Sequence, residues 1–224
     1  MKIQGNEIKG VIFDMDGVIL DSMPLWTKLG QRYVEKYGPG ADEEFTKAIF
    51  SMSIEEGIAY FKERYGITQS NEEILQELES YIRAYYYNEV KAKNGAKELM
   101  ESLKAAGIKV TAATSSMRHH IEHALERNGL LGYIDKLFTS GEVGSSKSDP
   151  EIYNLAAKHM GTAPGETLVF EDSLYALKTA KAAGYHTVGV YDAIGEPDQE
   201  GLKAEADAYI SNPGEFLKIM STQE

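Results

Sequence analysis

The chain contains no cysteine, and this absence excludes disulfide bonds and metal sites with thiolate ligands. Basic residues are also scarce, since 23 Lys and Arg stand against 35 Asp and Glu and give a formal net charge of −12. Because this charge repels a nucleic-acid backbone or an anionic membrane, we expect neither as a partner. An anionic small molecule would need local positive groups in order to bind.

Long apolar runs are missing as well. No stretch approaches the roughly 20 residues of a membrane-spanning helix, and the first seven residues lack the apolar core of a secretory signal. A cytoplasmic location is therefore expected. The remaining composition is ordinary for a folded protein, with 42% hydrophobic and 26% charged residues. The length of 224 residues suits one large and one smaller domain.

The pattern of elements predicts an α/β protein interrupted by an all-helical insert. Residues 22–87 show helical spacing of apolar side chains, and the capping boxes Ser53–Glu56 and Ser70–Glu73 each open such a pattern. After the insert, β-rich runs alternate with helices, which is typical of a parallel sheet. We therefore predict a Rossmann-like core domain made of residues 1–21 and 88–224, and a helical cap domain made of residues 22–87.

Short apolar runs mark the expected strands of the sheet: Gly10–Phe13, Ile108–Ala113, Lys136–Thr139, Thr167–Phe170 and Thr187–Val190. Asp149 and Pro150 are expected to open a helix that ends near Met160, with the aspartate as the cap and the proline at the first helical position. Ligands of open α/β sheets bind at the carboxyl ends of the strands. The polar residues that follow these runs are therefore the candidates for a functional site.

Two carboxylates, those of Asp14 and Asp16, follow the first strand, with Gly17 directly after them. Like charges at this spacing repel, so the pKa of one carboxyl would rise until it took up a proton, unless a cation lay close by. A hard divalent cation with oxygen ligands, Mg²⁺ above all, would remove that conflict. The same Asp-x-Asp pattern also occurs in helix caps and turns, so other residues must decide between the two interpretations.

Hydroxyl, basic and acidic residues follow three later strands: Thr114, Ser115 and Ser116, then Lys147, then Glu171 and Asp172. Hydroxyls at a helix N-terminus bind phosphate oxygens, although they also serve as ordinary caps. A lysine in a Gly/Ser loop is usually solvated, whereas adjacent acids at the end of a buried strand are costly unless a cation pairs with them. We expect all of these groups to meet at one edge of the sheet.

In this order, the motifs resemble those of the haloacid dehalogenase superfamily, in the branch with a helical cap inserted after the first strand. Asp14–Val18 matches the nucleophile motif Asp-x-Asp-Gly-Val/Thr of that family. Thr114 matches its strand-end hydroxyl, Lys147 its lysine, and Glu171–Asp172 its acidic pair. The resemblance spans almost the whole chain and implies a Mg²⁺-dependent phosphatase that acts on a small-molecule phosphate ester.

The resemblance also implies a role for each residue. Asp14 would attack phosphorus and form an aspartyl-phosphate, while Asp16 would protonate the leaving group and later deprotonate water. Thr114 and Lys147 would hold phosphoryl oxygens. The implied metal ligands are Asp14, the backbone carbonyl of Asp16, Glu171 and Asp172. Further candidates for contact with the substrate are Gly17, Trp26, Ser115 and Ser116.

Within this branch, the helical insert separates hydrolases from mutases. The β-phosphoglucomutases carry a histidine at the position of Trp26, and a lysine and an arginine where this chain has Phe50 and Ile54. Without those cations a second phosphate has no binding site, which favours a hydrolase over a mutase. The stretch Asp21–Trp26 resembles sugar-phosphate and hexitol-phosphate phosphatases, although Met23 replaces their glutamate. A sugar or polyol phosphate is therefore the expected substrate.

Three alternatives remain at this stage. Trp26 could pack within the helical domain instead of covering the substrate. A non-catalytic module that binds a phosphorylated metabolite is disfavoured, because every motif is intact. A second departure from the family, after Met23, is Ser148, where the family commonly has proline. Haloalkanoate dehalogenation is disfavoured because dehalogenases of this fold need no metal, whereas Asp16 and Glu171–Asp172 predict a metal site.

Overall fold

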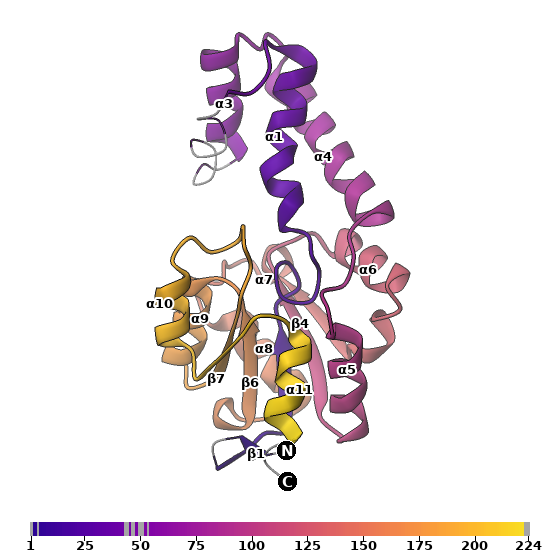
Figure 1. The fold of residues 1–224 in the computed structure, drawn as a ribbon, viewed down its shortest axis with the longest axis vertical. Coiled ribbons are helices and arrows are strands. Elements are labelled where there is room, and N and C mark those ends of the chain that lie inside the picture. The colour runs from indigo at the N-terminus through magenta and orange to yellow at the C-terminus, as the bar shows by residue number, and fades with distance from the viewer. Residues whose placement is uncertain are drawn as a thin grey trace. The chain divides into compact units, whose positions relative to one another are not determined.

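A computed structural model gives the structure of the chain and describes all residues except Met1, Gln4, 43–44, 46–47, 49–51, Ser53 and 222–224. The chain forms two compact units (Figure 1). One unit contains Met1–Asp21 and Val90–Glu224, and the other contains Ser22–Glu89. We call them the α/β unit and the helical unit. Among the described residues, no helix is long and apolar enough to cross a membrane.

The α/β unit is built on a sheet of six parallel strands in the order β5-β4-β3-β6-β7-β8. Their bounds are β3 Gly10–Phe13, β4 Lys109–Thr114, β5 Lys136–Thr139, β6 Thr167–Glu171, β7 His186–Val190 and β8 Ala208–Ile210. Every residue of β3 is buried, as expected for an apolar strand with neighbours on both sides. The predicted α/β class with a parallel sheet is confirmed.

Helices connect the strands, and a short antiparallel pair, β1 Lys2–Ile3 and β2 Asn6–Glu7, precedes the sheet. The helices of this unit are α5 Ala96–Ala105, α6 Arg118–Arg127, α7 Ser140–Val143, α8 Glu151–Met160, α9 Leu174–Ala182, α10 Gln199–Glu205 and α11 Pro213–Ser221. Single 3₁₀ turns span Leu131–Tyr133 and Pro164–Glu166. In Figure 1, α5 lies beside α11 and α9 beside α10, and these pairs are in contact.

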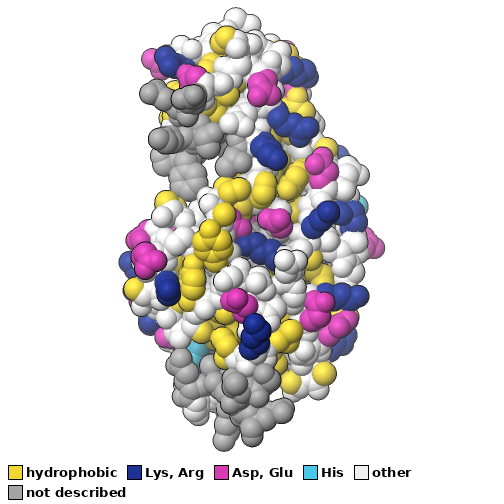
Figure 2. All heavy atoms as spheres, viewed as in Figure 1, with side chains coloured by type: hydrophobic (Ala, Val, Ile, Leu, Met, Phe, Trp, Pro, Cys, Tyr) yellow, Lys and Arg dark blue, Asp and Glu magenta, His cyan; other side chains and the backbone are white. Residues whose placement is uncertain are grey.

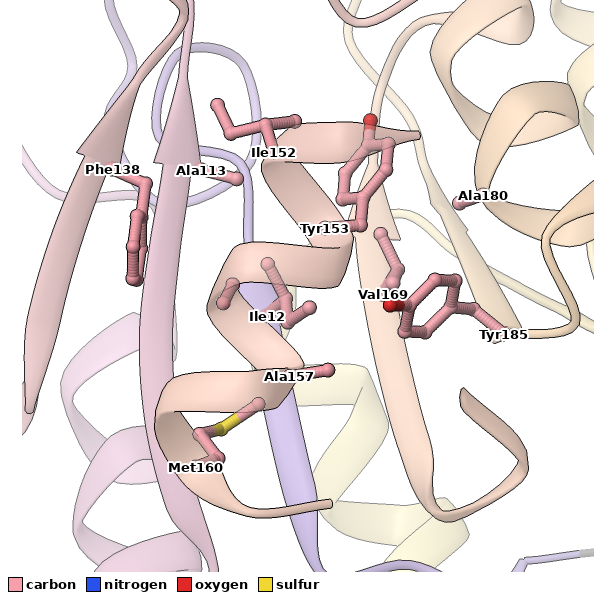
Figure 3. Close-up of a cluster of buried hydrophobic side chains, with 11 residues drawn as sticks. Ile12, Ala113, Phe138, Ile152, Tyr153, Ala157, Met160, Val169, Ala180 and Tyr185 are labelled. Carbon is pink, nitrogen blue, oxygen red and sulfur yellow. The ribbon is translucent and has the colours of Figure 1, made fainter. Parts of the chain in front are cut away.

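Helix α8 packs against the centre of the sheet. Its buried side chains recur at helical spacing and form one apolar face: Ile152, Tyr153, Ala156, Ala157 and Met160. Figure 3 shows this face among side chains from the strands, including Ile12, Ala113 and Val169. Each large apolar side chain buried here contributes roughly 1.5–3 kcal/mol to folding. The packing therefore fixes α8, and with it the loop that precedes the helix.

The structure shifts several predicted boundaries by one residue. Thr114 ends β4 and Glu171 ends β6, so both lie inside strands instead of following them. The N-cap position of α8 is Pro150, not Asp149, but the carboxylate of Asp149 still accepts a hydrogen bond from the backbone N–H of Glu151 at 2.9 Å. The edge strand β8 was not predicted, because its three residues are too few for a periodic pattern.

The helical unit contains α1 Met23–Tyr37, α3 Ile54–Tyr65 and α4 Asn71–Asn88. The capping box predicted at the start of α4 is confirmed, since Ser70 Oγ accepts from the N–H of Glu73 and the Glu73 carboxylate accepts from the N–H of Ser70. The other predicted box begins at Ser53, which lies outside the described residues. The same holds for Phe50 and for the side chain of Ile54.

Charged side chains of both signs are mixed on the face drawn in Figure 2. The net charge of −12 is therefore not gathered into a single acidic patch on that face. The net negative charge of the chain gives no overall long-range attraction to a polyanion.

We predict that Gly95→Ala destabilises the α/β unit by at least about 3 kcal/mol, as measured by urea unfolding. Gly95 has a φ of +77°, and an added Cβ would lie 2.2 Å from the Cα of Gly214. Backbone atoms cannot move aside as a flexible side chain can. Gly107→Ala is the matched control, because its φ is +70° but no atom lies within 4 Å of the added Cβ. That variant should lose only about 1 kcal/mol, and equal losses would contradict the prediction.

Candidate active site

The carboxyl ends of three neighbouring strands bring together the predicted residues Asp14 after β3, Thr114 at the end of β4, and Glu171 and Asp172 at the end of β6. The strand register pairs Phe13 with Phe170, so the next residues, Asp14 and Glu171, are level with each other. The backbone N–H of Asp14 donates to the carbonyl of Phe170 at 2.9 Å and continues this pairing. The parallel sheet therefore places both acidic motifs side by side.

Asp14, Glu171 and Asp172 form a buried acidic cluster. One carboxylate oxygen from each residue lies within 4.8 Å of the other two, and the three residues are 6%, 1% and 4% exposed. Burial, reinforced by the neighbouring carboxylates, raises the pKa of Asp14 well above its usual range. The same causes raise the pKa of Asp172 to about 7. Three acids so close together away from water can all be ionised only if a positive charge lies beside them.

Lys147 supplies one such charge. Its Nζ donates to Asp14 Oδ1 at 2.5 Å and to Glu171 Oε1 at 2.7 Å, and the residue is only 3% exposed. Burial disfavours the charged ammonium, but the two carboxylates outweigh burial and hold the pKa of Lys147 above its usual value. The usual interpretation of a lysine in a Gly/Ser loop, a solvated side chain, does not apply here.

Among the described residues, one carboxylate oxygen of the cluster is both fully buried and without a hydrogen-bond partner. Glu171 Oε1 accepts from Lys147 and from the hydroxyl of Tyr153 at 2.8 Å, whereas Glu171 Oε2 is buried without a hydrogen bond. An unpaired buried carboxylate oxygen costs free energy unless a cation or water satisfies it. The donors are all oxygen atoms and outnumber the single ammonium, so this set of residues fits a hard divalent cation.

The loop after β3 is compact and places Gly17 against Asp172. The N–H of Gly17 donates to the carbonyl of Leu20 at 2.9 Å, and the N–H of Leu20 donates to the carbonyl of Met15 at 2.8 Å. Gly17 has a φ of +75°, and a Cβ added there would lie 2.0 Å from Asp172 Oδ2. Glycine is therefore required both for the backbone conformation and for the space that the carboxylate occupies.

The three predicted hydroxyl residues, Thr114, Ser115 and Ser116, make different contacts. Thr114 is fully buried, and its Oγ1 accepts from the backbone N–H of Ser116 at 3.1 Å. The hydroxyl of Ser116 donates to Asp16 Oδ2 at 2.6 Å, so Ser116 joins Asp16 to the end of β4. Ser115 is exposed, and its Oγ lies 3.4 Å from that of Ser140.

Trp26 differs from the other candidates because it belongs to the helical unit. It lies on α1 with 37% of its surface exposed, so it is not fully packed within that unit. Its contact with a substrate stays a prediction.

Sequence reasoning missed Tyr153 and Gly195. A Cβ added at Gly195 would lie 2.6 Å from Asp172 Oδ2, so this glycine borders the same carboxylate as Gly17. The signal for Tyr153 was a hydroxyl-bearing side chain in the first turn of α8, shortly after Lys147. No local pattern marked Gly195, because its role depends on the distant Asp172.

A match to a protein family identifies the family of this chain. The model of the haloacid dehalogenase-like hydrolases matches residues 11–190. The chain belongs to this family. A phosphorylated carbohydrates phosphatase from Thermotoga maritima is 29% identical over 214 residues, which cover 95% of this chain and 98% of the relative. A validoxylamine A 7'-phosphate phosphatase from Streptomyces hygroscopicus subsp. limoneus is 28% identical over 208 residues, which cover 91% and 93%.

A solved structure agrees with this assignment. The crystal structure of a Thermotoga maritima protein, provisionally assigned as a beta-phosphoglucomutase, gives a TM-score of 0.86 at 30% identity and covers 97% of this chain and 100% of that one. The predicted family is therefore confirmed. The predicted class of enzyme, a phosphatase, is confirmed as well.

In the metal-free protein, we predict that the free energy of unfolding falls by on the order of 2 kcal/mol from about pH 5 to about pH 8. The pKa of Asp172 is about 7 in the folded protein, against a usual value of 3.8 in an unfolded chain. Between these values the folded state binds more protons, so stability is lost as the pH rises towards 7. Asp14 acts in the same direction. Urea unfolding in EDTA at several pH values measures the slope.

Asp172→Asn should reduce the dependence of the free energy of unfolding on pH, because the amide of asparagine does not titrate in this range. Glu126→Gln is the control, since Glu126 is an exposed carboxylate on α6 that does not belong to the acidic cluster. A slope that survives unchanged in Asp172→Asn would show that other groups cause the pH dependence.

Proposed function

We propose that this hydrolase is a Mg²⁺-dependent cytoplasmic phosphatase that cleaves a sugar or polyol phosphate through an aspartyl-phosphate at Asp14. The observation that carries the proposal is the buried cluster of three carboxylates around Lys147 at the carboxyl edge of the sheet. A phosphate ester is a dianion, so a site for it must combine a nucleophile with enough positive charge to offset the repulsion by its own carboxylates. One lysine is insufficient against three acids, and a divalent cation supplies the balance.

The residues that would hold Mg²⁺ are Asp14, the backbone carbonyl of Asp16, Glu171 and Asp172. Their fit to this ion rests on the oxygen-only donor set and on the buried, unpartnered Glu171 Oε2. When bound, Mg²⁺ supplies positive charge that screens the nucleophile from the anionic phosphate. The close approach of Gly17 and Gly195 to Asp172 would keep that ligand in place.

Asp14 would act as the nucleophile. Its carboxylate attacks phosphorus, the bond from phosphorus to the leaving oxygen breaks, and an aspartyl-phosphate forms. Attack requires the ionised carboxylate, which burial alone disfavours. The ammonium of Lys147 at 2.5 Å counteracts that penalty and orients the side chain. Lys147 would therefore both lower the cost of ionising Asp14 and stabilise phosphoryl oxygens in the transition state.

Asp16 would transfer the protons. Its carboxyl protonates the leaving alkoxide in the first step, and in the second step it takes a proton from the water that attacks the aspartyl-phosphate. The hydrogen bond from Ser116 to Asp16 Oδ2 at 2.6 Å supports a fixed orientation. Thr114 Oγ1 already accepts from the N–H of Ser116, which leaves the hydroxyl proton of Thr114 to donate to a phosphoryl oxygen.

Exposed apolar side chains support a leaving group with an apolar face, such as a sugar ring. In the described part of the α/β unit, the exposed large apolar side chains are Met117, Tyr175 and Tyr191. Each follows the carboxyl end of a strand, β4, β6 and β7 respectively. Tyrosine faces bind the C–H faces of sugars well. The names of the two phosphatase relatives point to phosphorylated sugar-like substrates in the same way.

The helical unit would act as a cap that supplies further contacts to the substrate, with Trp26 as one candidate. A β-phosphoglucomutase activity is the second candidate function, because the Thermotoga maritima structure described above is provisionally assigned to it. The tryptophan at position 26, where those mutases have histidine, favours hydrolysis over phosphoryl transfer between sugars.

The purified protein should hydrolyse 4-nitrophenyl phosphate in Mg²⁺, and excess EDTA should abolish the activity. Asp14→Asn should lower kcat by a factor on the order of 10³ or more, because the amide cannot form the covalent intermediate. Glu126→Gln serves as the control, since it removes an exposed carboxylate of the same unit. If the wild-type protein binds phosphate esters but releases no nitrophenol in Mg²⁺, a non-catalytic binding module becomes the better interpretation.

Substrate class is tested with a panel of phosphorylated sugars, polyols and nucleotides, with release of inorganic phosphate as the readout. We expect the highest kcat/KM among the sugar and polyol phosphates. In a parallel assay, β-glucose 1-phosphate and its bisphosphate activator should give free glucose and phosphate. Rapid formation of glucose 6-phosphate would instead establish the mutase.

A further inference from the structure

A second buried ion pair lies outside the proposed catalytic residues. Lys93 Nζ is 2.7 Å from Asp192 Oδ2, and the side chains are only 11% and 6% exposed. Lys93 lies three residues after Val90, where the chain re-enters the α/β unit, and Asp192 lies two residues after β7. A buried charge pair loses most of its hydration, and this loss costs free energy. A role in solubility therefore does not explain why the pair is present.

Asp192 shapes the loop that follows β7. Its Oδ1 accepts from the N–H groups of Ile194 and Gly195 at 2.9 and 3.0 Å. Lys93 Nζ also donates to the carbonyl of Tyr191 at 3.0 Å. The single ammonium is therefore bonded to both the main chain and the side chain of this loop, and together they fix its turn.

The same loop borders the proposed metal ligand Asp172. A Cβ added at Gly195 would lie 2.6 Å from Asp172 Oδ2, so Gly195 lies directly against this oxygen. Gly17 lies against the same oxygen. One residue further, Glu196 Oε2 accepts from the N–H of Leu174 at 2.8 Å and ties the loop to the segment that carries Asp172. The position of the carboxylate therefore depends on where the loop after β7 lies.

Lys93 is itself held by the segment that follows the Asp14–Gly17 turn. Its backbone N–H donates to the carbonyl of Ile19 at 2.8 Å, and Leu20 forms a β-bridge with Ala92. The N–H of Asp21 donates to the carbonyl of Lys91 at 2.8 Å. Both passages of the chain between the units are thus paired, and Lys93 links this pair to the loop beside Asp172.

We propose that the Lys93–Asp192 ion pair is a positioning device for the metal ligand Asp172. The pair holds the loop after β7 in a position where Gly195 lies against Asp172 Oδ2. This contact restricts the Asp172 carboxylate to the orientation that binds the ion. This inference rests on the proposed Mg²⁺ site. Groups that orient a metal ligand without touching the ion typically affect metal affinity by 10- to 100-fold. We therefore expect the pair to set Mg²⁺ affinity more than the rate of the chemical step.

The test measures Mg²⁺ binding by isothermal titration calorimetry, together with the Mg²⁺ dependence of kcat for 4-nitrophenyl phosphate. Lys93→Met and Asp192→Asn should each weaken Mg²⁺ binding by about 10- to 100-fold, while kcat at saturating Mg²⁺ changes by less than about fivefold. Lys93→Arg keeps the charge and should restore affinity to within about threefold of the wild type. Wild-type affinity in both Lys93→Met and Asp192→Asn would overturn the proposal.

Lys181→Met is the matched control, because Lys181 also contacts a backbone carbonyl, that of Glu205, and a carboxylate, that of Asp207 at 3.4 Å. It should bind Mg²⁺ as the wild type does, and an equal loss of affinity there would also overturn the proposal. Gly195→Ala tests the same contact without removing a charge, so it decides the matter if the charge variants do not fold. Its Mg²⁺ affinity should fall, and an unchanged affinity would contradict the inference.

Failure of the proposed function has a different signature. A wild-type protein that neither binds Mg²⁺ nor turns over the aryl phosphate would overturn the metal site and the positioning role together. A wild-type protein that does both, with variants that bind Mg²⁺ normally, would overturn the positioning role alone.

Discussion

The constraint on which the site depends is the burial of three carboxylates at one sheet edge with one lysine of the chain between two of them. Asp14, Glu171 and Asp172 repel each other in a place with little water, and Lys147 offsets part of that cost through two short hydrogen bonds. Other features of the unit follow from this arrangement. Helix α8 is packed on the sheet so that Tyr153 reaches Glu171, and glycines from two loops make room for Asp172.

Much of this arrangement could be predicted from the sequence, because it follows from local patterns and one rule of topology. A short β-branched run such as Gly10–Phe13 indicates a buried strand, and the carboxyl ends of parallel strands share an edge. These two statements bring Asp14 close to Glu171 without knowledge of any contact between them. The family assignment has the same basis, since it relies on the order of the motifs along the chain.

The rest depends on contacts between segments that no local pattern relates. Gly195 is an ordinary loop glycine until the chain folds and places it against Asp172, and Asp192 and Lys93 are separated by almost half of the sequence. The three-residue strand β8 is defined by its pairing with β7, not by its own composition. On α4 the buried residues Ile74, Leu78, Ile82 and Tyr86 recur every four residues, because they lie on the face of the helix that packs against its neighbours. Tyr85, three residues after Ile82, is only half-buried.

The lysine at the centre of the cluster differs from a dissolved cation in one respect: it is encoded, and so it arrives with every copy of the polypeptide. Its ammonium offsets part of the repulsion at the acidic edge without any bound ion. Synthesis and ion supply then become separate events in the cell. Under the proposed Mg²⁺ dependence, the number of folded molecules would follow translation, whereas the number of active molecules would follow the concentration of Mg²⁺.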